Sequence, residues 1–174
     1  MHLIKVLLVD DESDLLDILK VDIESLGYET LTASNGQEAL DIMKKVKEGT
    51  LWVDAVLSDI NMPVMNGLLF LKELRNLGLD IPFVFFSGYG DKEKTIEALR
   101  LGALDFLEKP YDPDVLLSTM KKAAELGSMM KEIEDELNDL VKNSGIAEAE
   151  VEKFKKAQRE MLKIKKMNEI YVKR

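Results

Sequence analysis

Short apolar runs alternate with amphipathic stretches from Ile4 to about Leu126. Short apolar runs bounded by polar residues are typical of buried strands, and apolar residues three or four positions apart are typical of helices that cover a sheet. The alternation predicts five βα units around a parallel sheet. The predicted strands are 4–9, 29–33, 55–58, 83–87 and 105–109. The predicted helices are 13–26, 36–47, 66–77, 91–101 and 113–126.

Residues 128–174 have a different pattern, which we interpret as a helical extension of a domain formed by residues 1–127. Its first part carries apolar residues at helical spacing: Met130, Ile133, Leu137 and Leu140. Its second part carries residues at coiled-coil spacing, with a polar Asn168 among them: Phe154, Ala157, Met161, Ile164 and Tyr171. A turn signal at 143–145 predicts a break between two helices. The first of them either continues the helix of 113–126 or is separated from it by a kink or stop at Gly127.

Composition narrows the chemistry that this chain can perform. The 174 residues contain no cysteine, which excludes disulfides and thiolate metal sites and fits a reducing cytoplasm. The single histidine is His2, so histidine-based metal sites and catalytic triads are not expected. The apolar run that starts at Leu3 is interrupted by Lys5 and matches neither a signal peptide nor a membrane span. Carboxylates must therefore carry the chemistry of a soluble cytoplasmic protein.

Charge is distributed unevenly along the chain. Residues 1–127 contain 13 basic and 23 acidic residues, whereas residues 128–174 contain 11 and 10. The basic stretch of 153–174 has the charge that attracts nucleic acid or anionic membranes, but no groove-reading module accompanies it. We therefore expect the extension to make helix-mediated protein contacts or a homodimer, and we expect no nucleic-acid or membrane partner.

Polar residues that can bind a metal ion or a phosphoryl group lie at the ends of four of the predicted strands. Asp10 and Asp11 follow the first strand and Asp59 follows the third; Ser87-Gly88 ends the fourth and Lys109-Pro110 ends the fifth. In an open parallel sheet these strand ends meet at one edge, where ligands bind. Each motif alone is common in turns and caps. Together, three carboxylates, a lysine and a hydroxyl predict a site for Mg²⁺ and a phosphoryl group.

These motifs resemble those of two-component response-regulator receiver domains, over residues 1–127. The resemblance is carried by Leu7-Leu8-Val9-Asp10-Asp11-Glu12, Asp59-Ile60-Asn61-Met62-Pro63-Val64-Met65-Asn66-Gly67, Phe86-Ser87-Gly88 and Lys109-Pro110. It implies a flavodoxin-like, doubly wound α/β fold with strand order 2-1-3-4-5. It also implies that a histidine kinase or histidine phosphotransfer protein transfers a phosphoryl group to Asp59.

The resemblance further assigns roles to individual residues. Mg²⁺ would be bound directly by Asp11, largely through water by Asp10, and also by Asp59 and the main-chain carbonyl of Asn61. The phosphoryl group would be contacted by Ser87, Gly88 and Lys109. Ser87 would then move towards it and leave space for Phe106, which would alter the surface formed by the fourth helix, fifth strand and fifth helix.

Two positions are expected to tune how long the phosphoryl group persists. Asn61 follows Asp59 by two residues and Tyr89 follows Ser87 by two residues, which places both side chains at the rim of the site. An amide can orient a hydrolytic water and a phenol ring can block its approach. The alternative for Tyr89 is simple packing on its loop.

Three functions are compatible with these features. The first is a phosphorylation-dependent switch that is not an enzyme in the usual sense and that signals through protein contacts. The second is a phosphorylation-independent scaffold that acts through the helical extension; the complete set of site residues weighs against it. The third is an aspartyl-phosphate hydrolase, which would need an acid two residues after Asp59, where this chain has Asn61.

Overall fold

The computed structural model describes residues 3–88, 92–144 and 148–171. The strands are β1 Lys5–Val9, β2 Glu29–Ala33, β3 Ala55–Asp59, β4 Phe83–Ser87 and β5 Asp105–Glu108. The helices are α1 Ser13–Glu24, α2 Gly36–Lys47, α3 Gly67–Asn76, α4 Lys92–Arg100, α5 Pro113–Ser144 and α6 Glu148–Tyr171. The predicted alternation of strands and helices is confirmed, and α5 is longer than the helix of 113–126.

All neighbouring strands are parallel, in the order β2-β1-β3-β4-β5, which confirms the predicted topology. The register pairs Val6 with Thr30 on one side and with Ala55 on the other. The chain therefore winds outward from β1 to β2 and then returns past β1 to β3. In open α/β sheets, ligands bind at the carboxyl ends of the strands on either side of such a reversal, which here are β1 and β3.

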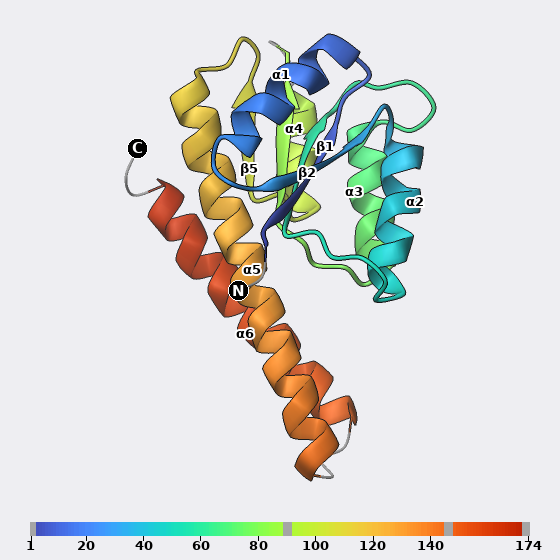
Figure 1. Ribbon diagram of the computed structural model, residues 1–174, viewed down its shortest axis with the longest axis vertical. Coiled ribbons are helices and arrows are strands. Elements are labelled where there is room, and N and C mark those ends of the chain that lie inside the picture. Colours follow the sequence, from blue (N-terminus) through green and yellow to red (C-terminus); the bar gives the residue numbers. More distant parts are fainter. Residues whose placement is uncertain (1–2, 89–91, 145–147, 172–174) are drawn as a thin grey trace.

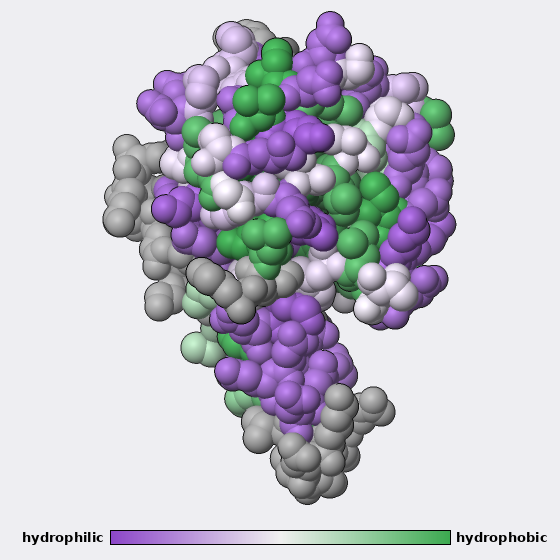
Figure 2. Space-filling model, in the orientation of Figure 1, coloured by the Kyte–Doolittle hydropathy of each residue, from purple (hydrophilic) through white to green (hydrophobic). Residues whose placement is uncertain are grey.

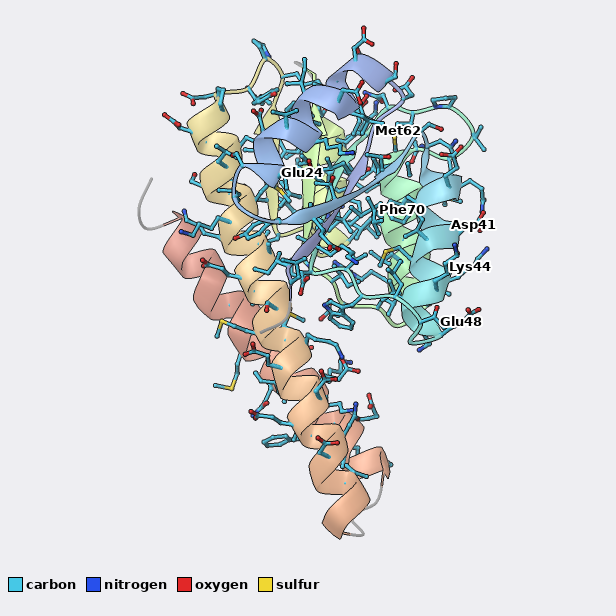
Figure 3. The ribbon with its side chains drawn as sticks, in the orientation of Figure 1. Glu24, Asp41, Lys44, Glu48, Met62 and Phe70 are labelled. Carbon is cyan, nitrogen blue, oxygen red and sulfur yellow. The ribbon has the colours of Figure 1, made fainter. Side chains whose placement is uncertain are left out.

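Helices cover both faces of the sheet and bury a separate apolar core on each (Figure 1). The core beneath α2 and α3 includes Phe70, Phe83 and Phe85, with ring centroids 5.5 Å apart for the first pair and 4.7 Å for the second. Figure 3 shows Phe70 on the inner side of α3, while Asp41 and other charged residues lie on the outer side of α2. The surface over the outer side of α2 is accordingly hydrophilic (Figure 2). This one-sided burial is what the helical spacing predicts.

The second core lies beneath α1 and α5, and includes Leu19, Phe86 and Met120. Its α5 residues include Leu126, the last residue of the predicted helix, and Met130 beyond it, and both are buried. Helix α5 therefore begins on the sheet and continues beyond it, and α6 returns antiparallel along α5 (Figure 1).

Gly127 lies inside α5 and does not kink or stop it. A Cβ at Gly127 would lie 1.8 Å from the main-chain oxygen of Asp54, the residue that precedes β3. Asp54 is itself fully buried, and its carboxylate accepts hydrogen bonds from Lys5 N and Trp52 Nε1 at 2.8 and 2.9 Å. Glycine at 127 thus serves the close approach of α5 to the sheet rather than a helix end.

Helix α6 packs on α5 through few apolar residues. Val151 is buried, and Lys155, which is 6% exposed, donates hydrogen bonds to Asn138 on α5 and to Glu152. Helix α5 ends at Ser144 and α6 begins at Glu148. The break predicted at 143–145 thus includes two residues that are still helical, and its last residue lies in 145–147, outside the described part. Among the described helices, none is long and apolar enough to cross a membrane. The division of the chain at residue 127 stays a prediction.

Replacement Gly127→Ala should destabilise the protein. An alanine in a helix interior ordinarily stabilises by about 1 kcal/mol relative to glycine. Here its Cβ meets backbone that cannot retreat without moving β3, so we expect a loss of about 1–3 kcal/mol in the free energy of unfolding. Urea denaturation measures this loss, and Ser128→Ala on the same helix is the control, expected within about 0.5 kcal/mol of the original chain. A gain in stability for Gly127→Ala would contradict the close approach.

Candidate functional site

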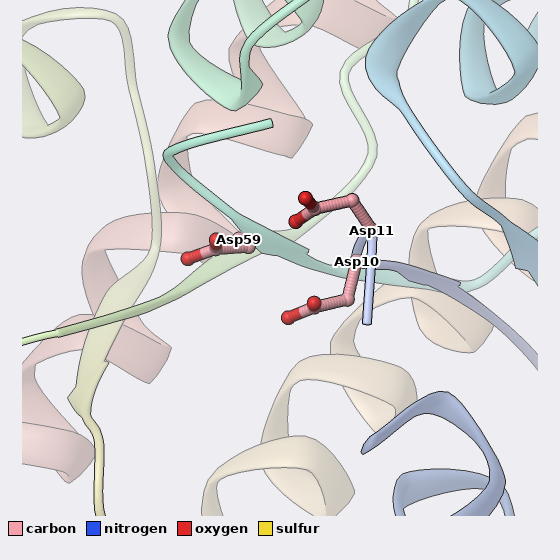
Figure 4. A group of neighbouring side chains, drawn as sticks. All are labelled: Asp10, Asp11 and Asp59. Atoms are coloured by element: carbon pink, nitrogen blue, oxygen red, sulfur yellow. The ribbon is translucent and has the colours of Figure 1, made fainter. Parts of the chain in front are cut away.

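Three carboxylates meet at the carboxyl ends of β1 and β3. Oxygen atoms of Asp10, Asp11 and Asp59 lie within 4.8 Å of one another (Figure 4). Asp10 and Asp59 are buried, whereas Asp11 is exposed. We call these three residues the acidic cluster. The predicted convergence of these side chains at one edge of the sheet is therefore present in the structure.

The turn from β1 into α1 fixes the orientation of Asp10. Its Oδ1 accepts a hydrogen bond from Glu12 N at 2.9 Å, which satisfies a main-chain donor just before α1. Its Oδ2 accepts a hydrogen bond from Lys109 Nζ at 2.8 Å. Both oxygens of this buried carboxylate are therefore held by the protein.

Lys109 connects β5 to the acidic cluster. Its Nζ lies 2.8 Å from Asp10 Oδ2 and 3.7 Å from Asp59 Oδ1. The same nitrogen lies 4.9 Å from the centroid of the Phe86 ring, a distance typical of a cation–π contact. Burial acts to lower the pKa of Lys109, but the hydrogen bond to Asp10 and the nearby carboxylates outweigh it and raise the pKa. Lys109 is therefore a fixed positive charge.

Asp59 carries the most perturbed carboxyl group of the site. Burial raises its pKa from 3.8 to about 6, and the negative charges of Asp10 and Asp11 act in the same direction. The positive charge of Lys109 opposes this shift without cancelling it. One ammonium group therefore does not neutralise the cluster, which leaves a favourable place for a further cation.

The loop after β3 is folded tightly over Asp59. A Cβ at Gly67 would lie 2.1 Å from Asp59 O, and Gly67 N donates to Ile60 O at 2.9 Å. The Asn66 side chain accepts a hydrogen bond from Leu69 N at 2.9 Å and so caps α3. Glycine and asparagine at the end of this motif thus return the chain directly into α3.

Asn61 is exposed on this loop, and its side chain is held by a residue that the sequence analysis did not identify. Lys94 on α4 donates a hydrogen bond from Nζ to Asn61 Oδ1 at 2.5 Å. Glu12 also contacts the site, because its Oε1 lies 3.7 Å from Lys109 Nζ, although the sequence motifs gave it no role. Glu12 directly follows the aspartate pair, but no motif or spacing pairs Lys94 with a residue 33 positions away.

Ser87 and Gly88 lie at the end of β4, next to β3. The Ser87 hydroxyl is buried and donates to Gly88 O at 3.3 Å, and a Cβ at Gly88 would have open space around it. Ser87 pairs with Glu108, two residues after Phe106, so Ser87 and Phe106 share a face of the sheet. Phe106 is half-buried. Tyr89 lies outside the described residues.

Comparison with known families gives a match over most of the chain. The model of the response regulator receiver domain matches residues 6–121. Regulatory protein AtoC of Escherichia coli is 38% identical over 129 residues, which are 74% of this chain and 27% of that protein. Response regulator SaeR of Staphylococcus aureus is 37% identical over 67% of this chain and 51% of its own length. The chain thus spans about a quarter and about half of these relatives.

Solved structures show the same fold. A response regulator receiver domain protein from Clostridium thermocellum is 31% identical and has a TM-score of 0.66, covering 74% of this chain and 99% of that chain. The chemotaxis protein CheY4 of Vibrio cholerae is 32% identical and has a TM-score of 0.62, covering 70% and 99%. The similarity therefore covers whole receiver structures but leaves part of this chain unmatched.

Replacement Asp59→Asn should stabilise the metal-free protein at neutral pH. The folded pKa of about 6 lies above the ordinary 3.8, so the folded state holds this proton more tightly and loses stability as pH rises from about 4 to about 6. Asparagine removes that loss, and a shift of this size corresponds to a gain of about 3 kcal/mol at pH 7 that disappears near pH 4. Urea denaturation with a chelator, at several pH values, measures the difference. A difference that does not change with pH would contradict this prediction.

Proposed function

Because the chain belongs to the response regulator receiver domain family, we propose that it is a phosphorylation-dependent signalling switch that accepts a phosphoryl group on Asp59. One observation carries this proposal: Asp59 is a buried carboxylate beside two further acids, with Lys109 Nζ 3.7 Å from its Oδ1. The donor is a phosphohistidine of a sensor kinase or a phosphotransfer protein. The chain acts as a phosphoacceptor that promotes its own phosphorylation and dephosphorylation.

Phosphoryl transfer replaces one bond to phosphorus by another. A carboxylate oxygen of Asp59 attacks the phosphorus of the donor, and an O–P bond forms while the N–P bond to the imidazole breaks. The bonding electron pair returns to the imidazole, and an acyl phosphate remains on Asp59. Lys109 offsets the negative charge of the incoming group, and its contact with Asp10 already directs its ammonium group to this edge.

The acidic cluster fits a Mg²⁺ ion. Mg²⁺ takes oxygen ligands, and the cluster offers three carboxylates of which only part of the charge is balanced by Lys109. Asp11, Asp59 and the main-chain carbonyl of Asn61 would hold the ion directly, and Asp10 largely through water. When bound, Mg²⁺ supplies positive charge that lowers the repulsion between Asp59 and an anionic donor.

Ser87 and Phe106 are the residues that would pass the signal on. Ser87, Gly88 and Lys109 would contact the phosphoryl group, and movement of Ser87 would leave space on the face of the sheet that it shares with Phe106. The altered surface is formed by α4, β5 and α5. Because α5 continues from this surface into the α5–α6 hairpin, we propose that output occurs through protein contacts of these helices rather than through nucleic acid.

Acetyl phosphate with Mg²⁺ should add one phosphoryl group to the protein. Intact-mass measurement detects the addition, and a chelator or Asp59→Asn should abolish it because each removes part of the site. Asp41→Asn, on the outer side of α2, is the matched control and should be phosphorylated like the original chain. Addition to Asp59→Asn at an unchanged rate would show that the phosphoacceptor is another residue.

Lys94 should shorten the lifetime of the phosphorylated state through Asn61. The hydrogen bond to Asn61 Oδ1 holds the amide that would orient a hydrolytic water, so we expect Lys94→Met to slow dephosphorylation by about two- to fivefold. The phosphorylated mass followed over time gives the rate. In an Asn61→Ala background the same change should have no effect, and equal effects in both backgrounds would exclude the coupling.

Tyr89 stays a prediction, since it lies outside the described residues. If its ring blocks the approach of water, Tyr89→Ala speeds dephosphorylation without preventing phosphorylation. An unchanged decay of the phosphorylated mass would exclude Tyr89 from this role.

A further inference from the structure

Among the α6 side chains that the structure describes, most of those that face the rest of the chain are polar. On the side towards α5, Lys155 is buried and donates to Asn138 Oδ1 at 2.6 Å, and Val151, earlier on the same helix, is also buried. A second side lines a pocket with the ends of α3 and α4. The α6 residues of that pocket are Glu152, Lys153, Lys156 and Glu160, opposite Arg75, Arg100, Leu101 and Gly102.

The third side of α6 is apolar and exposed. Phe154, Met161 and Ile164 expose 52%, 71% and 61% of their surface, and Ala157 between them is also exposed. We call these four residues the apolar stripe. A helix normally turns its apolar side inward, but the described side chains of α6 place Lys155 inward and the apolar stripe towards solvent. Packing within this chain therefore does not account for the stripe.

The sequence of the stripe matches a self-complementary coiled coil. Phe154, Met161 and Asn168 fall at successive a positions of a heptad, and the d positions hold Ala157, Ile164 and Tyr171. A single asparagine at an a position favours a parallel two-stranded pair, because it is best accommodated opposite itself. In such a pair, the g position of one helix faces the next e position of the other helix. These positions are Glu160 and Lys165, which have opposite charge.

We propose that the apolar stripe of α6 binds the same stripe of a second copy of this chain, in parallel and in register. This dimer would be one form of the output through α5 and α6 that is proposed above. Only its role in output rests on that proposed function. The described part of the stripe contains four positions per chain, so the interface is small. We therefore expect a dissociation constant that is roughly micromolar or higher.

Sedimentation velocity of the full, unphosphorylated chain over a wide concentration range tests the interface. We expect the dimer fraction to rise with concentration and to be lost in a Met161→Glu, Ile164→Glu variant. Val21→Glu on α1 is the matched control, because Val21 is 69% exposed and Met161 is 71% exposed. A monomer at every concentration, or a dimer that persists in the double variant, would overturn the proposal.

Cysteine cross-linking tests the orientation of the pair, since the chain contains no cysteine of its own. In a parallel pair in register, Ile164→Cys places two thiols opposite each other, and mild oxidation should link two copies. A disulfide that forms only between Phe154→Cys and Ile164→Cys copies would indicate antiparallel pairing and overturn the proposed arrangement. Circular dichroism of each variant confirms that it is folded.

Failure of this interface and failure of phosphoryl transfer are measured separately. The double variant keeps the acidic cluster intact, so it should still gain one phosphoryl group from acetyl phosphate. If the original chain is phosphorylated but never dimerises, only the proposed interface is wrong. If it dimerises but is not phosphorylated, only the proposed function is wrong.

Discussion

Repulsion among three carboxylates, balanced in part by one ammonium group, is the interaction on which the site of this protein depends. The sheet topology creates it, because the reversal of winding sets the ends of β1 and β3 side by side. Lys109 reaches the cluster from the far edge strand and contacts Asp10 more closely than Asp59. Of the two buried carboxylates of the cluster, Asp59 lies farther from the ammonium group, and burial together with the charges of Asp10 and Asp11 raises its pKa. The residue proposed to accept the phosphoryl group is therefore also the one at which burial of a carboxylate is least favourable.

Two neighbouring residues of β4, Phe86 and Ser87, belong to the site but lie on opposite faces of the sheet. Phe86 lies in the core beneath α1 and α5 and carries the Lys109 ammonium group on its ring. Ser87, the next residue, shares the opposite face with Phe106. Since successive side chains of a strand alternate in direction, the residue that contacts the Lys109 ammonium group and the residues of the proposed switch lie on opposite faces of the sheet.

Much of this arrangement could be predicted from the sequence because it follows from periodicity and from strand ends. The strands, their order and the acidic cluster are of this kind. Other features depend on distances between segments that no pattern encodes. Gly127 suggests a helix stop, but the actual constraint is the backbone of Asp54, far away in the chain. The contact of Lys94 with Asn61 and the outward direction of the apolar stripe likewise require knowledge of how α4 and α6 are placed.

The unbroken course of α5 through Gly127 gives the protein a mechanical lever. Its first half is fixed in the core, and its second half projects from Gly127 to Ser144, a span of roughly 25 Å at the rise of an α-helix. A tilt of about 5° at the sheet would displace the far end by about 2 Å at that length. A tilt of α5 about the contact between Gly127 and Asp54 would therefore turn a small change of packing near β5 into a larger displacement at the far end of α5.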